Sequence, residues 1–250
     1  MPLMIDVPLI FPTGARPSYN LGSIMHGMLM DKFTETEKES FHLQGLKPLT
    51  QHIIVDKNKK VIWRVCGLDE KIEERLKEII TVDFNNKEWY LKQKGYDIHA
   101  DKDIKIVNKS YNQIAEECFV QNYLRRRVRL KLRTPMGFKK DGDYVTFPSA
   151  ELIIKSLYAK WCSFSKTLRL DDEKVLEQLC TNTYISGYNL RSAKFKLEGT
   201  SINSFIGILE ISVTGPDALV RLAIMLFEYA KFCGIGIKTT LGMGGVEINE

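Results

Sequence analysis

The sequence is poor in the residues that build a disulfide framework or a zinc site. Its 250 residues include five cysteines, and none of them forms a CxxC or CxxH pair. Scattered cysteines in an odd number are typical of reduced thiols in the core of a cytoplasmic protein. We therefore expect neither disulfides nor a metal site, and the sequence points to no cofactor.

Long apolar runs are absent as well. No window approaches the roughly 18 apolar residues of a membrane-spanning helix. Residues 1–20 lack the basic start and the continuous apolar stretch of a secretion signal. Because 44% of the residues are hydrophobic and glycine and proline are not enriched, we expect a folded cytoplasmic protein with one large core or two small ones.

Hydrophobic periodicity divides the first half of the chain into helices and short strands. Apolar residues at three- and four-residue spacing predict helices over residues 21–33 and after Asp69, a residue type that favours a helix N-terminus. Short apolar runs predict strands at residues 4–11, 53–55, 61–65 and 104–107. The order is β-α-β-β-α-β, that of the ferredoxin-like unit.

The second half repeats that order with longer insertions. Residues 128–133 alternate with period two, the clearest strand pattern in the chain. The other predicted elements are a hairpin arm at 144–147, helices at 149–164 and 171–180, strands at 184–197 and 205–213, a helix that begins at Pro216, and a last strand around Val246. We therefore predict an α+β fold of two tandem ferredoxin-like (RRM-like) domains, residues 1–115 and 120–250, joined near residues 109–124.

A glycine-rich segment follows the last predicted helix, with five glycines in residues 234–245. Glycines let backbone N–H groups approach a phosphate closely. Neither the dinucleotide-binding fingerprint nor the P-loop spacing fits. The segment predicts a phosphate-binding loop; the alternative is a connection that only packs a helix against a strand. The candidate phosphate-binding residues here are Gly234, Gly236, Lys238, Thr239, Thr240, Gly242 and Gly244.

Residues 125–140 contain eight cations and no acidic residue, although the net charge of the whole chain is only +5. Side chains alternate along a strand, so Arg127, Arg129 and Lys131 are expected on one face, about 6.6 Å apart. That spacing is similar to the spacing of phosphates along a nucleic-acid strand. The alternative is a solvated strand face. The candidate RNA-binding residues are Arg125, Arg127, Arg129, Lys131, Arg133 and Lys139.

Histidine is scarce, with four in the chain. His26 lies in the first predicted helix and His42 ends the next helical turn, so neighbouring elements can bring the two imidazoles together. Histidine titrates near neutrality and can serve as base or acid in RNA cleavage by 2′-hydroxyl attack. Lys47 can stabilise the charge on the phosphorane. A packed or surface role is the alternative for each histidine, and we assign that role to His52 and His99.

Together these features resemble the CRISPR-associated repeat-RNA-processing endoribonuclease family of the RAMP superfamily, in its type III-like form. Residues 234–244 match the family's glycine loop, Gly-h-Gly, five residues including a Lys or Arg, and Gly-h-Gly. Residues 21–30 resemble its first helix and residues 41–49 its histidine-containing segment. Residues 133–148 resemble the strand and hairpin that open its second domain.

The resemblance implies metal-independent cleavage of precursor CRISPR RNA within its repeats, leaving a 2′,3′-cyclic phosphate (or a 3′-phosphate) and a 5′-hydroxyl. It implies His26 and His42 as the acid–base residues and Lys47 as an electrostatic one. Relatives often carry a tyrosine on the first helix, where this sequence has Met28 and Met30. Which histidine is the base is therefore open. The implied partners are CRISPR repeat RNA, a type III interference complex and a second copy in a homodimer, with no membrane.

Two other functional classes follow from the same features. A non-catalytic RNA-binding subunit of an RNA-guided complex would share the glycine loop and the fold, and the paired histidines speak against it. A metal-dependent nuclease would need clustered carboxylates. The acidic run at residues 171–173 is instead typical of a helix N-terminus.

Overall fold

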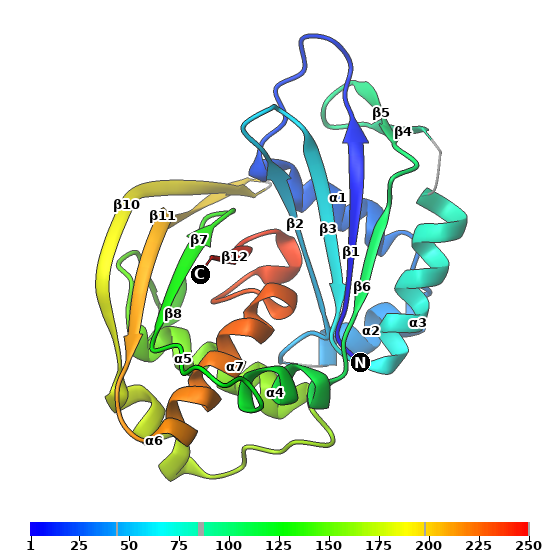
Figure 1. Ribbon diagram of the computed structural model, residues 1–250. Coiled ribbons are helices and arrows are strands. Elements are labelled where there is room, and N and C mark those ends of the chain that lie inside the picture. Colours follow the sequence, from blue (N-terminus) through cyan, green and yellow to red (C-terminus); the bar gives the residue numbers. More distant parts are fainter. Residues whose placement is uncertain (44, 85–87, 198, 250) are drawn as a thin grey trace.

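The computed structural model describes residues 1–43, 45–84, 88–197 and 199–249. In these ranges the chain forms two large antiparallel sheets, one from each half (Figure 1). The first sheet, at the right of Figure 1, has the strand order β2-β3-β1-β5-β4, and β6 also pairs with β1. Its strands are β1 (Leu3–Ile10), β2 (Leu49–Val55), β3 (Val61–Gly67), β4 (Glu88–Leu91), β5 (Tyr96–Ala100) and β6 (Lys105–Asn108).

The second sheet, at the left of Figure 1, has the order β10-β11-β7-β12. Its strands are β7 (Arg127–Leu132), β10 (Thr183–Leu197), β11 (Thr200–Val213) and β12 (Val246–Asn249), and β8 (Phe138–Lys140) and β9 (Asp143–Val145) form a separate hairpin. The helices of this half are α5 (Ala150–Phe164), α6 (Glu173–Asn182) and α7 (Asp217–Cys233).

The helices of the first half are α1 (Gly22–Met30), α2 (Glu35–Leu43), α3 (Glu70–Ile79) and α4 (Tyr111–Phe119), with a short 3-10 helix η1 (Tyr19–Leu21) and a short π-helix η2 (Ile80–Phe84). As the sequence predicted, α3 begins after Asp69, whose side chain accepts a hydrogen bond from the backbone N–H of Ile72 at 2.8 Å. None of the helices in the described part of the chain is long and apolar enough to cross a membrane.

Both sheets are built by the same sequence of elements. The first runs β1-α1-β2-β3-α3-β6 and the second β7-α5-β10-β11-α7-β12, with α2, the β4–β5 hairpin, the β8–β9 hairpin and α6 inserted. The four strands of each such unit also lie in the same spatial order, β2-β3-β1-β6 in the first sheet and β10-β11-β7-β12 in the second. This confirms the predicted α+β fold of ferredoxin-like units.

One face of each sheet is buried against helices of its own half. Leu3, Ile5 and Val7 of β1 are fully buried and pack in one hydrophobic cluster with α1 and α3. Val128 and Leu130 of β7 are buried in a second cluster with α5 and α7. The strict alternation that predicted β7 is therefore the alternation between core and exposed face.

The two halves also contact each other. Tyr19 stacks on Phe195 with ring centroids 6.4 Å apart. The Thr50 hydroxyl on β2 donates to the carbonyl of Phe232, at the end of α7, at 2.6 Å. Because the halves share such contacts as well as having separate clusters, the division into domains 1–115 and 120–250 stays a prediction.

Two elements were missed by the sequence analysis. The segment expected to be a connection, residues 109–124, contains α4. Its start has a capping box, in which Ser110 and Gln113 each bond the backbone N–H of the other. Tyr111 and Ile114 are buried on one side of this helix. The β4–β5 hairpin was missed because its strands are only four and five residues long and contain few buried residues.

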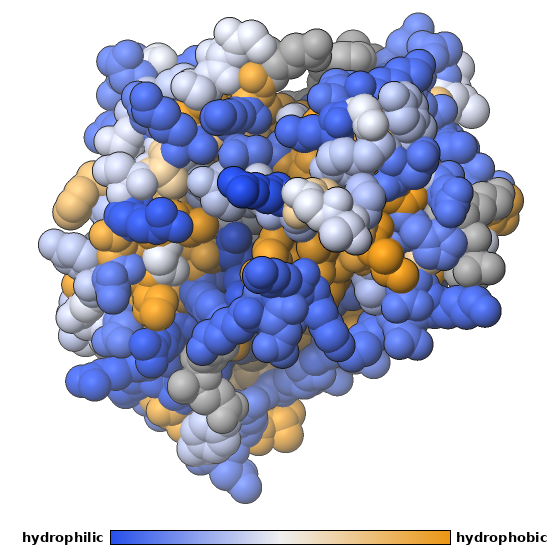
Figure 2. Space-filling view, turned by 90° about the horizontal axis from the view of Figure 1, so that it is seen from above, coloured by the Kyte–Doolittle hydropathy of each residue, from blue (hydrophilic) through white to orange (hydrophobic). Residues whose placement is uncertain are grey.

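The end of the first sheet at which β1 finishes is seen from above in Figure 2. Hydrophilic residues cover most of this face, and hydrophobic ones gather in a band across its middle (Figure 2). Ile10, the last residue of β1, is 52% exposed. An open groove of about 560 Å³ beside it is lined mainly by apolar residues, including Phe11, Pro12 and Val55.

Candidate active site

A cavity of about 170 Å³ lies where α1, α2 and the glycine-rich segment meet. Three predicted site residues, His26, Lys47 and Thr240, lie in its wall although they come from opposite ends of the chain. The complete lining is His26, Met30, Lys38, Phe41, Lys47, Leu49 and Thr240. The fold thus brings the histidine helix and the glycine-rich segment to one place.

His26 is half-buried on α1, one turn after the helix begins at Gly22. Burial and the nearby Lys47 ammonium lower the pKa of His26 to about 4, while the Thr240 backbone raises it. Its buried Nδ1 has no hydrogen-bond partner among the described residues. The imidazole is therefore neutral near pH 7 and is suited to accept a proton.

Lys47 follows α2 and donates a hydrogen bond from Nζ to the carbonyl oxygen of Phe41. Burial and the positive charge of Lys238 lower the pKa of Lys47. Lys238 is exposed and has a left-handed backbone, with φ of 54°. Two cations, one from each half of the chain, thus act on the same small region beside His26, which suits it to a bound anion.

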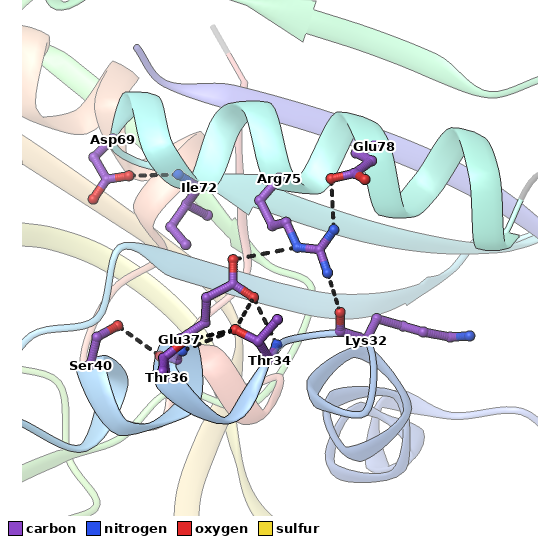
Figure 3. A network of polar contacts seen from close by, with 9 residues as sticks. All are labelled: Lys32, Thr34, Thr36, Glu37, Ser40, Asp69, Ile72, Arg75 and Glu78. Carbon is purple, nitrogen blue, oxygen red and sulfur yellow. Dashed lines mark hydrogen bonds and ion pairs between the residues drawn. The ribbon is translucent and has the colours of Figure 1, made fainter.

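The other predicted catalytic histidine, His42, lies on α2. Its side chain is outside the part of the chain that the structure describes, so its pairing with His26 stays a prediction. The structure does show how α2 is held. At its start, the backbone N–H of Thr34 donates to Glu37 Oε2 at 2.8 Å, and the N–H of Glu37 is 3.3 Å from the Thr34 hydroxyl, which caps the helix (Figure 3).

Arg75 of α3 connects that cap to the neighbouring turn. Its Nε lies 3.4 Å from Glu37 Oε1, and its guanidinium also bonds the carbonyl of Lys32 and, at 2.6 Å, the carboxylate of Glu78 (Figure 3). One planar guanidinium thereby joins the α1–α2 turn, the start of α2 and α3. The helix that carries His42 is fixed to the first sheet's own core helix.

The glycine-rich segment is packed tightly against the first half. A Cβ on Gly242 would lie 2.9 Å from Cα of Gly22, and a Cβ on Gly245 would lie 2.5 Å from the ring of His52. These positions admit only glycine because two backbones, or a backbone and a ring, are in direct contact. Packing, the alternative left open by the sequence, accounts for these glycines.

The expected phosphate cradle of free glycine amides needs correction. The backbone N–H groups of Gly234 and Gly244 donate to other carbonyls, and that of Gly236 donates to the Ser156 hydroxyl at 2.9 Å. These amides are already used within the fold and are not presented to a phosphate. RNA contact by this segment stays a prediction, and the groups best placed for it are the exposed Lys238 and the cavity-lining Thr240.

The basic strand β7 has the predicted alternation, with its arginines outward and Val128, Leu130 and Leu132 buried. Its cations are partly neutralised by carboxylates from elsewhere in the chain, which the sequence window did not show. Cations of residues 125–140 form five such ion pairs: Arg125–Glu228 at 2.6 Å, Arg126–Asp217 at 2.9 Å, Arg133–Glu247 at 2.7 Å, and Arg129–Glu210 and Lys131–Glu247 at 3.9 Å. Arg127 and Lys139 are exposed.

His52 and His99 lie away from the cavity. His52 on β2 is buried, and burial together with the charges of Arg64 and Arg133 lowers its pKa to about 3. His99 lies on β5, where it pairs across the sheet with Ile10 of β1. Within the described residues no group of three or more His, Cys, Asp or Glu is placed to hold a metal ion.

Lys38 was not singled out by the sequence analysis. It lines the cavity from α2 and pairs with Glu35 at 2.8 Å. Its position four residues before His42, hence on the same side of the helix, was the available signal. The cavity wall therefore contains a second lysine besides Lys47.

Residues 130–246 match the family model described as CRISPR-associated endoribonuclease Cas6. Among curated proteins, the chain is similar to the CRISPR-associated endoribonuclease Cas6 of Streptococcus thermophilus, with 29% identity over 240 residues that cover 94% of this chain and 93% of that protein. It is also similar to the protein of the same name from Mycobacterium tuberculosis, with 23% identity over 251 residues that cover 98% of this chain and 76% of that protein.

Solved structures resemble the whole chain. A Cas6 product complex has a TM-score of 0.81 at 20% identity, covering all of both chains. Thermus thermophilus Cas6 has a TM-score of 0.72 at 17% identity, covering all of this chain and 98% of that one. A protein described as a RAMP protein binding different RNA substrates has a TM-score of 0.64 at 14% identity. These similarities show a common fold.

Proposed function

We propose that the chain is a member of the CRISPR-associated Cas6 endoribonuclease family and that it cuts precursor CRISPR RNA within each repeat to release guide RNAs. The observation that carries the proposal is the cavity shared by His26, Lys47 and Thr240. It combines a neutral imidazole with converging positive charge, which are the two requirements of cleavage by a 2′-hydroxyl.

In the proposed reaction, His26 takes the proton of the 2′-hydroxyl, whose oxygen attacks the adjacent phosphorus. The P–O5′ bond breaks, and His42 protonates the leaving 5′-oxygen. The products carry a 2′,3′-cyclic phosphate, which water can open to a 3′-phosphate, and a 5′-hydroxyl. The low pKa of His26 supports its assignment as the base, because a base must be unprotonated when the reaction begins.

Stabilisation of the negative charge that builds up on the phosphorane is assigned to two lysines. Lys47 borders the cavity, and Lys238 is close enough to lower its pKa. An anion between them would be stabilised by both and would relieve their mutual repulsion. The proposed mechanism accordingly uses protein cations and no metal ion.

RNA on either side of the cut is proposed to bind the open face of β7. Arg127 and Arg129 lie on that face, and the pairing of Arg129 with Glu210 at 3.9 Å is long. Exposed ion pairs of this kind contribute little to stability, so a phosphate can replace the carboxylate at small cost. Such binding is salt-dependent and independent of sequence.

Further parts of the proposal concern organisation. We propose that residues 1–115 and 120–250 act as two domains, that the protein works in the cytoplasm, and that its product passes to a type III interference complex. Self-association as a homodimer is the remaining proposal. Light scattering of the free protein and of its RNA complex measures it, and a single-copy mass in both would refute it.

The deciding experiment incubates the purified protein with its repeat RNA in EDTA and identifies the product ends. His26→Ala and His42→Ala are each expected to slow cleavage by about 10² while RNA binding is kept. His99→Ala is the matched control, because His99 lies on β5 outside the cavity. Tight binding without cleavage by the unaltered protein would instead indicate a non-catalytic RNA-binding subunit.

A further inference from the structure

Gln51 on β2 is fully buried, and its amide joins segments that are distant in the sequence. Its Nε2 donates to the carbonyl oxygens of Gly22 and Thr240, each at 2.8 Å, and its Oε1 accepts from Nε1 of Trp63 at 3.0 Å. Because an indole N–H can only donate, Trp63 determines which end of the amide is the oxygen. Both amide N–H groups then have to point toward the two carbonyls.

Those carbonyls belong to the two segments that meet at the cavity. Gly22 is the first residue of α1, and His26 follows it by one turn. Thr240 lies in the glycine-rich segment and lines the cavity itself. The amide of Gln51 is therefore a direct bridge between the helix that carries His26 and the segment that carries Lys238 and Thr240.

The bridged segments are already in contact. A Cβ on Gly22 would lie 2.6 Å from the carbonyl oxygen of Leu241. No side chain separates the two backbones, and the Gln51 amide holds them at this close distance by bonding a carbonyl of each. If the amide were lost, the indole N–H of Trp63 and the carbonyls of Gly22 and Thr240 would lose this partner, and the segments would shift.

We infer that Gln51 is a positioning residue for RNA cleavage, whose amide holds α1 against Thr240 so that His26 and Lys47 share one cavity. The inference rests on the proposed function. Gln51 does not line the cavity and touches no reacting atom. It acts through the carbonyl of Thr240 and the first turn of α1, and small displacements of an acid–base group are costly to the rate of reaction.

The test compares Gln51→Met with Thr50→Val. Both remove a buried polar bond of β2 to the second half of the chain, but the Thr50 hydroxyl bonds Phe232 and not the cavity wall. Gln51→Met is expected to lower the single-turnover cleavage rate about tenfold or more. Binding of repeat RNA with a 2′-deoxy group at the cut site should stay within about twofold of the unaltered protein. Thr50→Val should cut at the normal rate once corrected for its folded fraction.

A second readout does not depend on cleavage. NMR titration of the histidines, with His26 assigned from a His26→Asn spectrum, should show the His26 midpoint shifted by about half a pH unit or more in Gln51→Met. The His26 pKa falls if His26 loses its hydrogen bond to the Thr240 backbone, and it rises if the imidazole becomes less buried. A displacement of α1 changes both contributions, so the midpoint should move. Thr50→Val should leave the midpoint in place.

Gly22→Ala provides an independent variant in case Gln51→Met does not fold. It leaves Gln51 intact and forces α1 away from Leu241, so it should reproduce the loss of rate with retained binding. The inference about Gln51 would be overturned if the unaltered protein cuts RNA, Gln51→Met or Gly22→Ala cuts equally fast, and the His26 midpoint is unchanged. That result would leave the proposed function standing. An unaltered protein that does not cut would overturn the proposed function, and the NMR titration would still decide the role of Gln51.

Discussion

His26 and Lys47 lie in the wall of one cavity, and the ammonium of Lys47 is one of the two influences that lower the pKa of His26. The two residues reach the cavity from different elements, His26 from α1 and Lys47 from the segment that precedes β2. The charge state of each residue therefore affects the other. Burial and the charge of Lys47 together lower the pKa of His26, and an unprotonated His26 adds no further positive charge beside Lys47.

The first prediction concerns the pH dependence of cleavage. If His26 is the base, the rate should rise with pH through a midpoint at about 4, because only the neutral imidazole accepts a proton. Lys47→Gln removes a positive charge that lowers this pKa, so the midpoint should move to higher pH while the maximal rate falls by about 10². Single-turnover rates between roughly pH 3 and pH 8 measure both effects.

Lys38→Gln is the control for that series. Lys38 also lines the cavity but is not among the groups that shift the pKa of His26. Its substitution should leave the midpoint of the acid limb in place. Equal shifts in the two variants would show that general loss of positive charge, and not Lys47, controls His26.

The second prediction concerns stability at acidic pH. His52 is buried between Arg64 and Arg133, and its pKa is lowered from 6.5 to about 3 in the folded protein. Between these two values the unfolded chain binds the proton and the folded protein does not, so the free energy of unfolding should fall as pH drops from about 6.5 toward 3. His52→Gln cannot titrate and should flatten this part of the curve, as measured by urea unfolding at several pH values. Curves of equal slope would contradict the prediction.

Much of this fold was predictable because its local patterns are strict. The alternation over residues 128–133 appears unchanged as the inward and outward faces of β7, with Val128 and Leu130 buried. The helix after Asp69 begins where its capping residue predicted. In both cases the signal and the structure depend on residues within one turn or one strand.

What could not be predicted depends on residues that are distant in the sequence. Glu247, for example, reaches Arg133 only after β12 has paired with β7. The glycines of residues 234–245 suggested free amides, but whether an amide is free depends on partners such as Ser156, eighty residues away. Of the candidate active site, the sequence identified His26 and Lys47, while the bridging role of Gln51 needed the three-dimensional contacts.

The third prediction concerns RNA affinity. Arg127 is exposed on the basic face of β7, so Arg127→Ala should weaken RNA binding and reduce the salt dependence of the logarithm of the binding constant by about one unit of slope. Arg126→Ala is the matched control, because Arg126 is committed to the carbonyl of Gly215 and to Asp217 at 2.9 Å. Titrations of RNA at several salt concentrations measure both slopes. A larger effect from Arg126 would place the RNA on another face.

The last prediction separates the two costs of replacing a glycine. Gly244 has φ of 68°, and a Cβ there would lie 2.0 Å from the carbonyl oxygen of Ile235. Gly14 has φ of 87° but no heavy atom within 4 Å of its Cβ position. Gly14→Ala should therefore cost only the backbone strain, about 1 kcal/mol of unfolding free energy. Gly244→Ala should cost about 1–3 kcal/mol more, because the added carbon has to displace backbone.

Urea unfolding of the two variants beside the unaltered protein measures this difference. The comparison bears on the function of the glycine-rich segment as well as on its stability. If close packing is the reason for glycine at position 244, Gly244→Ala should be strongly destabilised even in the absence of RNA. If the two variants lose equal stability while Gly244→Ala alone loses RNA affinity, contact with phosphate, and not packing, would be the reason that glycine is needed there.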